Sequence, residues 1–393
     1  MQLTPRAVLT QFGHLLQTTL LPVVSDQVGT LTPQLESLVS ILALVPLGKF
    51  VSSSRGQVGH PSCERQSLVS AFIAKAVLNL RHTRQLIDRL KVDEPLRRIC
   101  GWHYPSDVPH ESTFSRAFSE FAKTELPQKL HETVIQATQQ SRLVGHIARD
   151  STAIEVRERY DREPKHKPLP ARKTGRPKKG SKALPSRRLP RQRRQKLPEM
   201  LAELPRNCSV GVKTASDGNP KYWRGYKLHL DVADGQIPIS CVLTAASVHD
   251  SQVAIPLATM TASRVTSLYD LMDSAYDAQQ IREHSCSLGH VPIIAYHERT
   301  VPISKKHAMT LSRGDRRKLP AMEKWRRPGK QKPLTPAEEE RFKERTMSER
   351  VNGRLKDEFG GRNIFVRGAA KVMAHLMFGV LALTVDQWLR FGA

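Results

Sequence analysis

Hydrophobic residues in the first 140 positions recur at intervals of three and four, which is the period of an α-helix. Two such segments lie between residues 67 and 90, and a third carries Phe114, Phe118 and Phe121 on one stripe. An apolar stripe of this kind usually packs against a core. Residues 1–140 are therefore predicted to form a helical N-terminal domain.

After residue 141 the pattern changes to short apolar or alternating runs bounded by turn residues, which are typical of strands. Three of these runs follow one another, and two more alternate with helical segments. That order predicts an α/β fold over residues 141–393, with a mixed five-stranded sheet flanked by helices. The predicted strands cover residues 145–154, 226–233, 238–244, 267–272 and 290–296, and the predicted helices cover residues 247–258, 278–287 and 336–389.

Two basic segments interrupt this order, at residues 157–220 and 297–340. Residues 157–196 hold 17 Lys or Arg against three acids, together with six prolines and no periodic apolar face. Such a stretch cannot bury enough apolar surface to fold, and its like charges repel one another. We expect a disordered, solvated insert over residues 157–220.

The overall charge indicates the class of partner. Lys and Arg number 62 against 37 Asp and Glu, so the net charge is +25 and the pI is near 10.2. A protein this basic usually binds a polyanion, because each cation that meets a phosphate releases condensed counterions. Ribosomal, chromatin-like and DNA-processing proteins share this bias, so charge leaves the activity open.

Cysteine spacing and hydropathy indicate the cellular compartment and whether a membrane is involved. The five cysteines form no C-x-x-C pair, which disfavours a thiolate zinc site, and no secretory signal pattern is present, which favours the reducing cytoplasm. Residues 38–51 are too short to cross a bilayer, and residues 372–389 include His375, Asp386 and Gln387. Both segments are predicted to be core helices, so no association with a membrane is expected.

Three carboxylates stand where chemistry could occur. Asp150 and Asp273 each sit at the end of an apolar strand-like run, residues 146–150 and 268–273, and carboxylates at strand ends meet at one edge of a sheet. Either aspartate alone could equally be a turn or cap residue. Glu349 belongs to a set that shares one helical face within roughly 60°, at offsets of 0, 3, 7 and 14. The set consists of Phe342, Arg345, Glu349 and Lys356.

The run Phe342-x-x-Arg345-x-x-x-Glu349-x-x-x-x-x-x-Lys356 resembles the Tyr-Arg-Glu-Lys signature of the DDE transposases of bacterial insertion sequences, with Phe in place of Tyr. Asn352 is also typical of that neighbourhood. Three further segments are similar to the same family, and the likeness spans most of the chain from about residue 60 onward. They are Pro109-His-Glu-Ser-Thr-Phe-Ser-Arg116, Trp223-Arg-Gly-Tyr-Lys-Leu-His229 and Leu243-Thr-Ala-Ala-Ser-Val-His-Asp-Ser251.

The resemblance implies an RNase H-like core in which Asp150, Asp273 and Glu349 hold two divalent cations, Mg²⁺ or Mn²⁺. The implied reaction is cleavage of phosphodiesters at transposon ends and transfer of the strand to target DNA. Arg345 and Lys356 would grip phosphates, and Phe342 lacks the hydroxyl that the family's tyrosine offers. The implied partner is double-stranded DNA, bound by a homodimer in the cytoplasm, with the N-terminal domain on the DNA ends.

Two local motifs have more than one interpretation. Arg176, Lys178 and Lys179 in Gly-Arg-Pro-Lys-Lys resemble the core of an AT-hook, which enters a narrow minor groove. His249-Asp250 precedes a predicted helix, so Asp250 either caps that helix or acts beside the catalytic carboxylates or on DNA.

Other functions remain open at this point. The chain could be a transposase-derived DNA-binding protein without activity, or a nuclease of the same core that cuts without joining. A basic RNA-binding protein would explain the charge but not the spacing of the three carboxylates.

Overall fold

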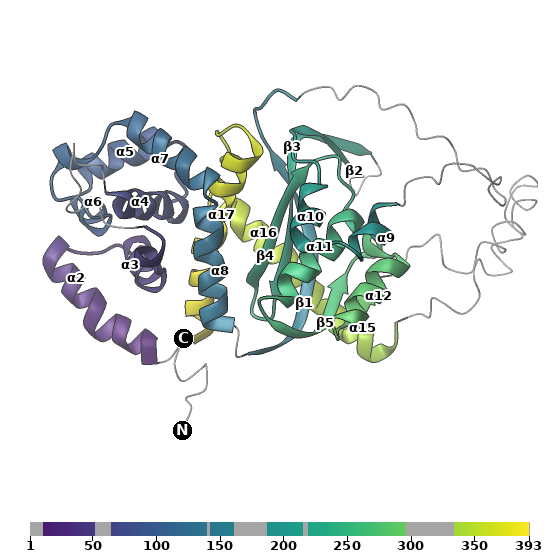
Figure 1. Ribbon diagram of the computed structural model, residues 1–393. Coiled ribbons are helices and arrows are strands. Elements are labelled where there is room, and N and C mark those ends of the chain that lie inside the picture. The colour runs from purple at the N-terminus through teal and green to yellow at the C-terminus, as the bar shows by residue number, and fades with distance from the viewer. Residues whose placement is uncertain are drawn as a thin grey trace, which may run out of the picture.

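The computed structural model has a helical part and a sheet part, with helix α17 between them (Figure 1). The sheet part agrees with the predicted α/β class, a mixed sheet flanked by helices. The structure describes residues 11–51, 64–139, 142–160, 187–214, 219–295 and 334–392. The basic motif at Arg176, Lys178 and Lys179 and most of the second basic segment lie outside these residues.

The helical part contains the elements before residue 140. Their starts follow ordinary capping chemistry: Thr32 accepts a hydrogen bond from the Leu35 N–H, and Asp93 accepts one from the Leu96 N–H. The elements are η1 (Leu16–Leu20), α2 (Leu21–Val28), α3 (Pro33–Leu44), η2 (Leu47–Lys49), α4 (Arg65–Val77), α5 (Thr83–Val92), α6 (Glu94–Ile99), η3 (Pro105–Asp107), α7 (Glu111–Lys123) and α8 (Leu126–Gln139).

The phenylalanine stripe of α7 forms the centre of this part. Phe114 and Phe121 are buried and lie 5.9 and 6.2 Å from the ring of Phe72 on α4. Phe378 of α17 (Ala369–Gly392) stacks on the other side of Phe72, at 5.7 Å. The predicted core role of the stripe is confirmed, and a helix from far along the chain completes that core.

The sheet has six strands, because β2 joins the five that were predicted. Strand β3 pairs antiparallel with β1, β2 and β4, whereas β1, β5 and β6 run parallel to one another. Gly225 in β3 has φ +148°, and a Cβ there would lie 2.1 Å from the Ile154 carbonyl oxygen, so only glycine fits. The strands are β1 (Leu143–Glu155), β2 (Ser209–Thr214), β3 (Pro220–Ala233), β4 (Ile237–Ala245), β5 (Thr266–Met272) and β6 (Val291–Ile294).

Helices cover both faces of the sheet (Figure 1). Leu228 and Leu230 of β3 share a core with α16 and α17, whereas Val242 of β4 packs with residues of α10 and α11 on the opposite face. The elements around the sheet are α9 (Arg188–Gln192), α10 (Leu197–Ala202), α11 (Ser251–Ala262), η4 (Ser274–Tyr276), α12 (Gln279–Ser287), α15 (Pro336–Phe342), η6 (Lys343–Arg345) and α16 (Thr346–Asp357).

The expectation of disorder throughout residues 157–220 is wrong for the described portion after residue 187. Two short helices and strand β2 form there. Their few apolar residues pack on the sheet part: Met200 joins the core of α11 and α12, and Leu204 joins that of β4. Burial of these scattered side chains outweighs the local charge, which a composition argument cannot detect.

The continuous helical face predicted from Phe342 to Lys356 is also interrupted. Helix α15 ends at Phe342, a 3₁₀ turn spans Lys343–Arg345, and α16 begins at Thr346. A 3₁₀ turn advances three residues per turn instead of 3.6, so the positions before it rotate relative to those after it. Residues 358–368 then separate α16 from α17.

Among the described helices, α17 is long and apolar enough to cross a membrane by length and composition, and 67% of its most apolar window is buried inside the structure. It contacts α4, α7 and α8 in the helical part and β4 in the sheet part. The burial agrees with the predicted core helix.

Candidate active site

The pairing of β1 with β5 brings two aspartates to one edge of the sheet. Arg149 of β1 lies opposite Met272 of β5 in parallel register, so Asp150 and Asp273 occupy the next position along each segment. Asp273 follows the end of β5 as predicted, but Asp150 lies within β1, which continues to Glu155 and does not end at Asp150. Side chains alternate between faces along a strand. Both carboxylates therefore project from the same edge, on the face away from Arg149.

Beneath this edge lies a buried ion pair that joins β1 to β3. The Arg149 Nε and Nη2 atoms donate to the two carboxylate oxygens of Asp231, at 2.8 and 2.7 Å, and Thr261 of α11 donates to Asp231 at 2.7 Å. Burial alone would lower the pKa of Arg149, but Asp231 and Asp270 hold it above its ordinary value. We call Arg149, Asp231 and Thr261 the anchor network.

Asp150 faces α16 with little compensation for its charge. The Asn352 Nδ2 atom donates to its carboxylate at 3.3 Å, and the Ser151 backbone N–H supports it. Burial, followed by the negative charge of Asp273, raises the pKa of Asp150 to about 6. An ionised Asp150 is thus costly here unless a cation joins it.

Asp273 lies at the start of the 3₁₀ turn η4. Its carboxylate accepts the Ala275 N–H at 3.0 Å, which is the cap role that the sequence left open. Burial, and then the charge of Asp250, raises the pKa of Asp273. The cap uses one oxygen, so the other remains available to a ligand.

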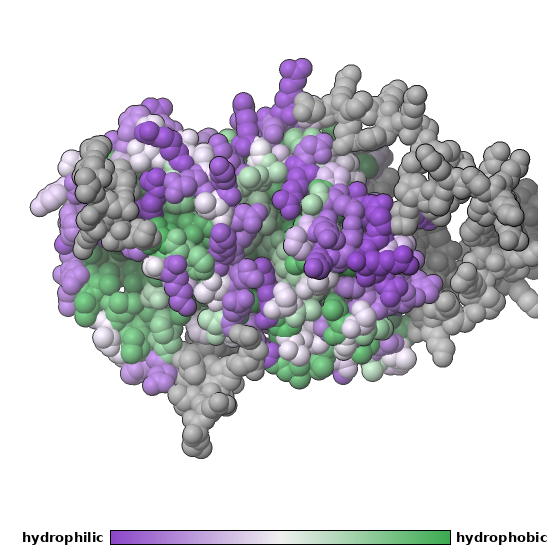
Figure 2. Space-filling view, viewed as in Figure 1, coloured by the Kyte–Doolittle hydropathy of each residue, from purple (hydrophilic) through white to green (hydrophobic). Residues whose placement is uncertain are grey.

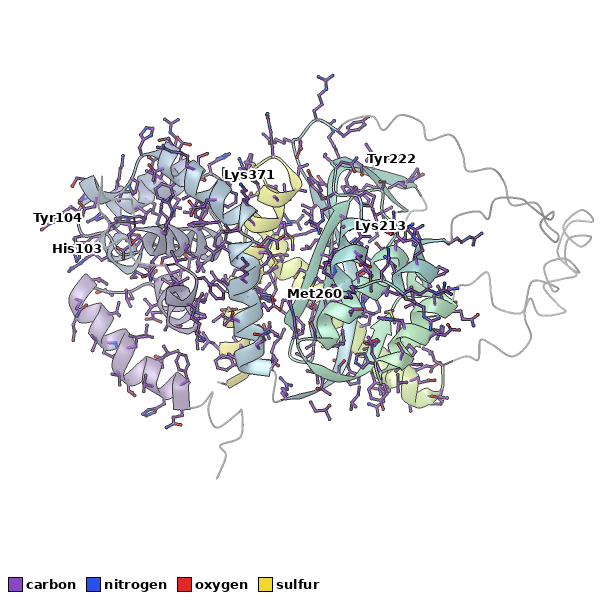
Figure 3. All side chains as sticks on the ribbon, in the orientation of Figure 1. His103, Tyr104, Lys213, Tyr222, Met260 and Lys371 are labelled. Atoms are coloured by element: carbon purple, nitrogen blue, oxygen red, sulfur yellow. The ribbon has the colours of Figure 1, made fainter. Side chains whose placement is uncertain are left out.

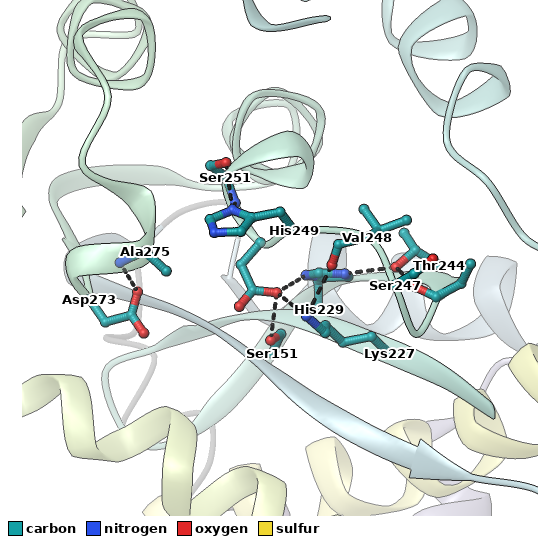
Figure 4. Close-up of polar contacts among 12 residues, drawn as sticks. Ser151, Lys227, His229, Thr244, Ser247, Val248, His249, Ser251, Asp273 and Ala275 are labelled. Atoms are coloured by element: carbon teal, nitrogen blue, oxygen red, sulfur yellow. Dashed lines mark hydrogen bonds and ion pairs between the residues drawn. The ribbon is translucent and has the colours of Figure 1, made fainter. Parts of the chain in front are cut away.

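A third aspartate, Asp250, joins this edge from the start of α11, where it contacts Ser151 and Lys227; these two residues are labelled in Figure 4. Its Oδ1 atom accepts hydrogen bonds from the Ser151 hydroxyl at 2.9 Å and the Lys227 ammonium at 3.0 Å. Burial would raise the pKa of Asp250, but His229, Lys227 and Ser151 together lower it. Its carboxylate makes no cap hydrogen bond, so the capping interpretation is wrong. We call Asp150, Asp250 and Asp273 the edge carboxylates.

A buried phenol lies within the field of all three. Tyr276 of η4 is 1% exposed, and its hydroxyl has no hydrogen-bond partner among the described residues. Burial, and then the charges of Asp250, Asp150 and Asp273, raises the pKa of Tyr276 well above its ordinary value. The phenol therefore stays protonated and can donate to a group that arrives at this edge.

Glu349 does not point at the edge carboxylates. It is 55% exposed, and its Oε1 atom accepts a hydrogen bond from Arg345 at 2.5 Å. Among the residues that the structure describes, no three His, Cys, Asp or Glu side chains already converge on one metal position. The sheet thus brings Asp150 and Asp273 together, whereas the third predicted ligand is turned to its own helix.

Four of the predicted DNA contacts, Phe342, Arg345, Asn352 and Lys356, lie along the same segment, and the others lie outside the described residues. Phe342 lies 5.8 Å below the Arg345 guanidinium, and Lys356 lies two turns further on, where burial and nearby Arg362 lower its pKa. Asn352 is buried and faces Asp150. Three members of the set therefore remain accessible, and Asn352 instead supports the carboxylate.

Of the two interpretations of Asp250, the one that places it beside the catalytic carboxylates agrees with the structure, whereas sequence reasoning missed the part played by Lys227. Both residues lie in segments that resemble the family. The signal that could have found Lys227 is strand alternation. Lys227, His229 and Asp231 are alternate residues of β3 and face α11 together, opposite Leu228 and Leu230.

A hydrophilic surface lies over α9 and α12 (Figure 2). It includes Arg191 and Arg193, which pair with Glu203 and Glu283. These ion pairs tie the short helix α9 to residues near α10 and in α12.

Comparison with known families gives two matches. A family model described as a transposase DDE domain matches residues 145–385, which is more than half of the chain. A second model, described as a transposase domain, matches residues 27–120. No curated protein and no solved structure matches the chain.

Proposed function

Because the chain belongs to the DDE transposase family, we propose that it cleaves phosphodiesters at the ends of a transposable element and joins the freed strand to target DNA. The observation that carries this proposal is the pairing of Asp150 with Asp273 at one sheet edge, next to the helix that bears Glu349. The helical part, which matches a second transposase model, would hold the DNA ends. Joining two ends calls for a homodimer on double-stranded DNA.

The edge carboxylates suit hard divalent cations. Oxygen ligands favour Mg²⁺ or Mn²⁺ over zinc, and the unsatisfied charge that raises the pKa of Asp150 is what a cation would relieve. When bound, two such ions would activate the attacking water or 3′ hydroxyl and neutralise charge on the phosphorus oxygens. Asp150, Asp273 and Glu349 would hold them.

Glu349 could join this set only after it leaves Arg345. The pair is solvent-exposed, so its disruption costs about 1 kcal/mol or less. A phosphate binds a guanidinium through two hydrogen bonds and competes well with a single carboxylate contact. We infer that a DNA phosphate on Arg345 releases Glu349 toward the edge carboxylates, so that the complete site forms only on DNA.

The remaining residues orient the reacting groups. Ser151 links two carboxylates, because its backbone N–H supports Asp150 and its hydroxyl holds Asp250. Lys227 also donates to the Val248 carbonyl at 3.0 Å, which keeps Asp250 in place. Positioning of this kind, together with neutralisation of charge, is the main contribution of a protein to phosphoryl transfer.

The test is a strand-transfer assay with Mg²⁺ and the element's own terminal sequences. Asp150→Asn, Asp273→Asn and Glu349→Gln should each reduce cleavage at least a thousandfold while end binding in EDTA stays within about twofold. Asp277→Asn, which alters an acid close in the chain to Asp273, serves as the matched control. Full cleavage by any of the three variants would remove that residue from the site.

Two further functions of the same fold are separated by the products. A nuclease would release cut ends but no joined target DNA, and an inactive DNA-binding descendant would bind the ends without cutting them. The presence of all three predicted metal ligands favours an active enzyme, because a protein that only binds DNA does not need them.

A further inference from the structure

A cavity of about 460 Å³ lies between the helical part and α17, away from the edge carboxylates. It is bounded by α4, by α7, by the segment that follows Gly360 and by the first turns of α17. Lys371 lies at this junction (Figure 3). The size is that of a site for one small ligand.

The floor of the cavity contains a buried amine with no counter-charge. Lys75 of α4 is 8% exposed, lines the cavity and has no ion pair or hydrogen bond among the described residues. Burial lowers the pKa of Lys75 to about 8, so the ammonium form still dominates at neutral pH. A buried, unpaired charge is costly to keep, and an anion in the cavity would offset that cost.

The walls combine further cations with apolar surface. Arg367 and Lys371 line the cavity, and within the described residues neither forms an ion pair with an acid. Among the described residues that line the cavity, Glu111 is the single acid. Phe365, which is 37% exposed, supplies apolar area, so the cavity suits a ligand with one anionic and one flat apolar end.

We propose that the cavity holds one unpaired nucleotide from the end of the bound DNA, with its phosphate near Lys75, Arg367 and Lys371 and its base against Phe365. A duplex is too thick to enter a space of this size, whereas a single nucleotide fits. The site rests on the proposed function for its source of DNA. A free nucleotide has the same chemistry and is the other source to be tested.

The position of the cavity supports DNA as the source. The segment from Lys356 through Arg362 to Arg367 runs from the predicted phosphate-gripping helix to the cavity mouth. Arg362 lies close enough to Lys356 to lower its pKa. A strand that follows these cations would bring its terminal nucleotide to the cavity.

The experiment measures binding of the full chain to two labelled duplexes of the terminal sequence in EDTA, one blunt and one with a single unpaired nucleotide at its end. Wild type should bind the second duplex about tenfold more tightly, which is the effect of one stacked base. Lys75→Met should remove this preference and leave affinity for the blunt duplex unchanged. Lys91→Met, an exposed lysine of α5, is the matched control and should keep the preference.

Other results would overturn the assignment. Equal affinity of wild type for both duplexes, or equal losses on both in Lys75→Met, would do so. So would tight binding of free dAMP or dTMP without any duplex preference, which would make a free nucleotide the ligand. Lys75→Met removes a buried charge, so this variant should fold at least as stably as wild type. Arg367→Gln, at the exposed mouth of the cavity, is a second test and should lose part of the preference for the duplex with the unpaired nucleotide. Absence of strand transfer with the preference intact would remove the proposed function and keep the site.

Discussion

Asp231 and Asp150 lie on neighbouring strands of the same sheet, yet their surroundings are opposite. Asp231 is completely buried and accepts hydrogen bonds from both Arg149 nitrogens and from Thr261. Asp150 is partly exposed, and among the described residues its one side-chain donor is Asn352 at 3.3 Å. The anchor network is thus satisfied within the fold, whereas the charges of Asp150 and Asp273 are only partly compensated and would be balanced by an incoming cation. The buried anchor network can therefore hold Asp150 and Asp273 in position although their charges are only partly compensated.

The largest expected difference is in stability. Asp231→Ala leaves the buried Arg149 guanidinium unpaired, and it should lower the free energy of unfolding by about 3–5 kcal/mol. Glu349→Gln breaks an exposed pair and should change it by less than about 1 kcal/mol. Denaturant unfolding of the full chain measures both, and similar losses in the two variants would contradict the comparison.

Asp150→Asn should raise the free energy of unfolding, which is opposite to the effect of Asp231→Ala. The pKa of Asp150 in the folded protein lies above its value in the unfolded chain, so the ionised carboxylate destabilises the fold. This destabilisation is complete above about pH 6 and absent below about pH 4. In EDTA the variant should gain about 1–3 kcal/mol at pH 7.5, and the gain should fade as the pH drops through 6 toward 4. A gain that does not vary with pH would refute the raised pKa.

Lys227→Met tests the support of Asp250. Loss of this positive charge raises the pKa of the carboxylates around it, so the acid limb of the cleavage rate should shift upward by about one pH unit. Lys227→Arg keeps the charge and should leave the limb in place. A rate that falls equally at every pH would indicate a structural role only.

The smallest expected effect is on the affinity for the DNA ends. Phe342→Tyr restores the hydroxyl that the family signature carries beside Arg345, and should tighten end binding by about 0.5–1.5 kcal/mol. The measurement is fluorescence anisotropy with the terminal sequence. Phe342→Leu, which cannot donate, is the control and should show no gain.

The sequence sufficed for features that depend on short-range periodicity. The apolar run before Asp273 correctly placed this residue at a strand end, whereas Asp150 lies within β1, which continues to Glu155; the parallel register of β1 with β5 puts the two side by side. The role of Asp250 depends on Lys227, 23 positions earlier, and a local cap rule is blind to that contact. The sequence did not predict strand β2, because its pairing with β3 is a contact between distant positions. It also did not predict the 3₁₀ turn before α16, because this turn leaves the pattern of polar residues unchanged. The position of Glu349 as a ligand stays a prediction.

Helix α17 has a consequence for how the chain matures. Phe378 fills the space beside Phe72, so the helical part has an incomplete core until a segment that follows the whole sheet region has been made. During synthesis the first helices would wait with an open apolar face while the strands emerge. A message truncated before residue 369 would therefore yield a product prone to aggregation and proteolysis rather than a free-standing DNA-binding fragment, which limits the accumulation of partial copies that could occupy the element's ends.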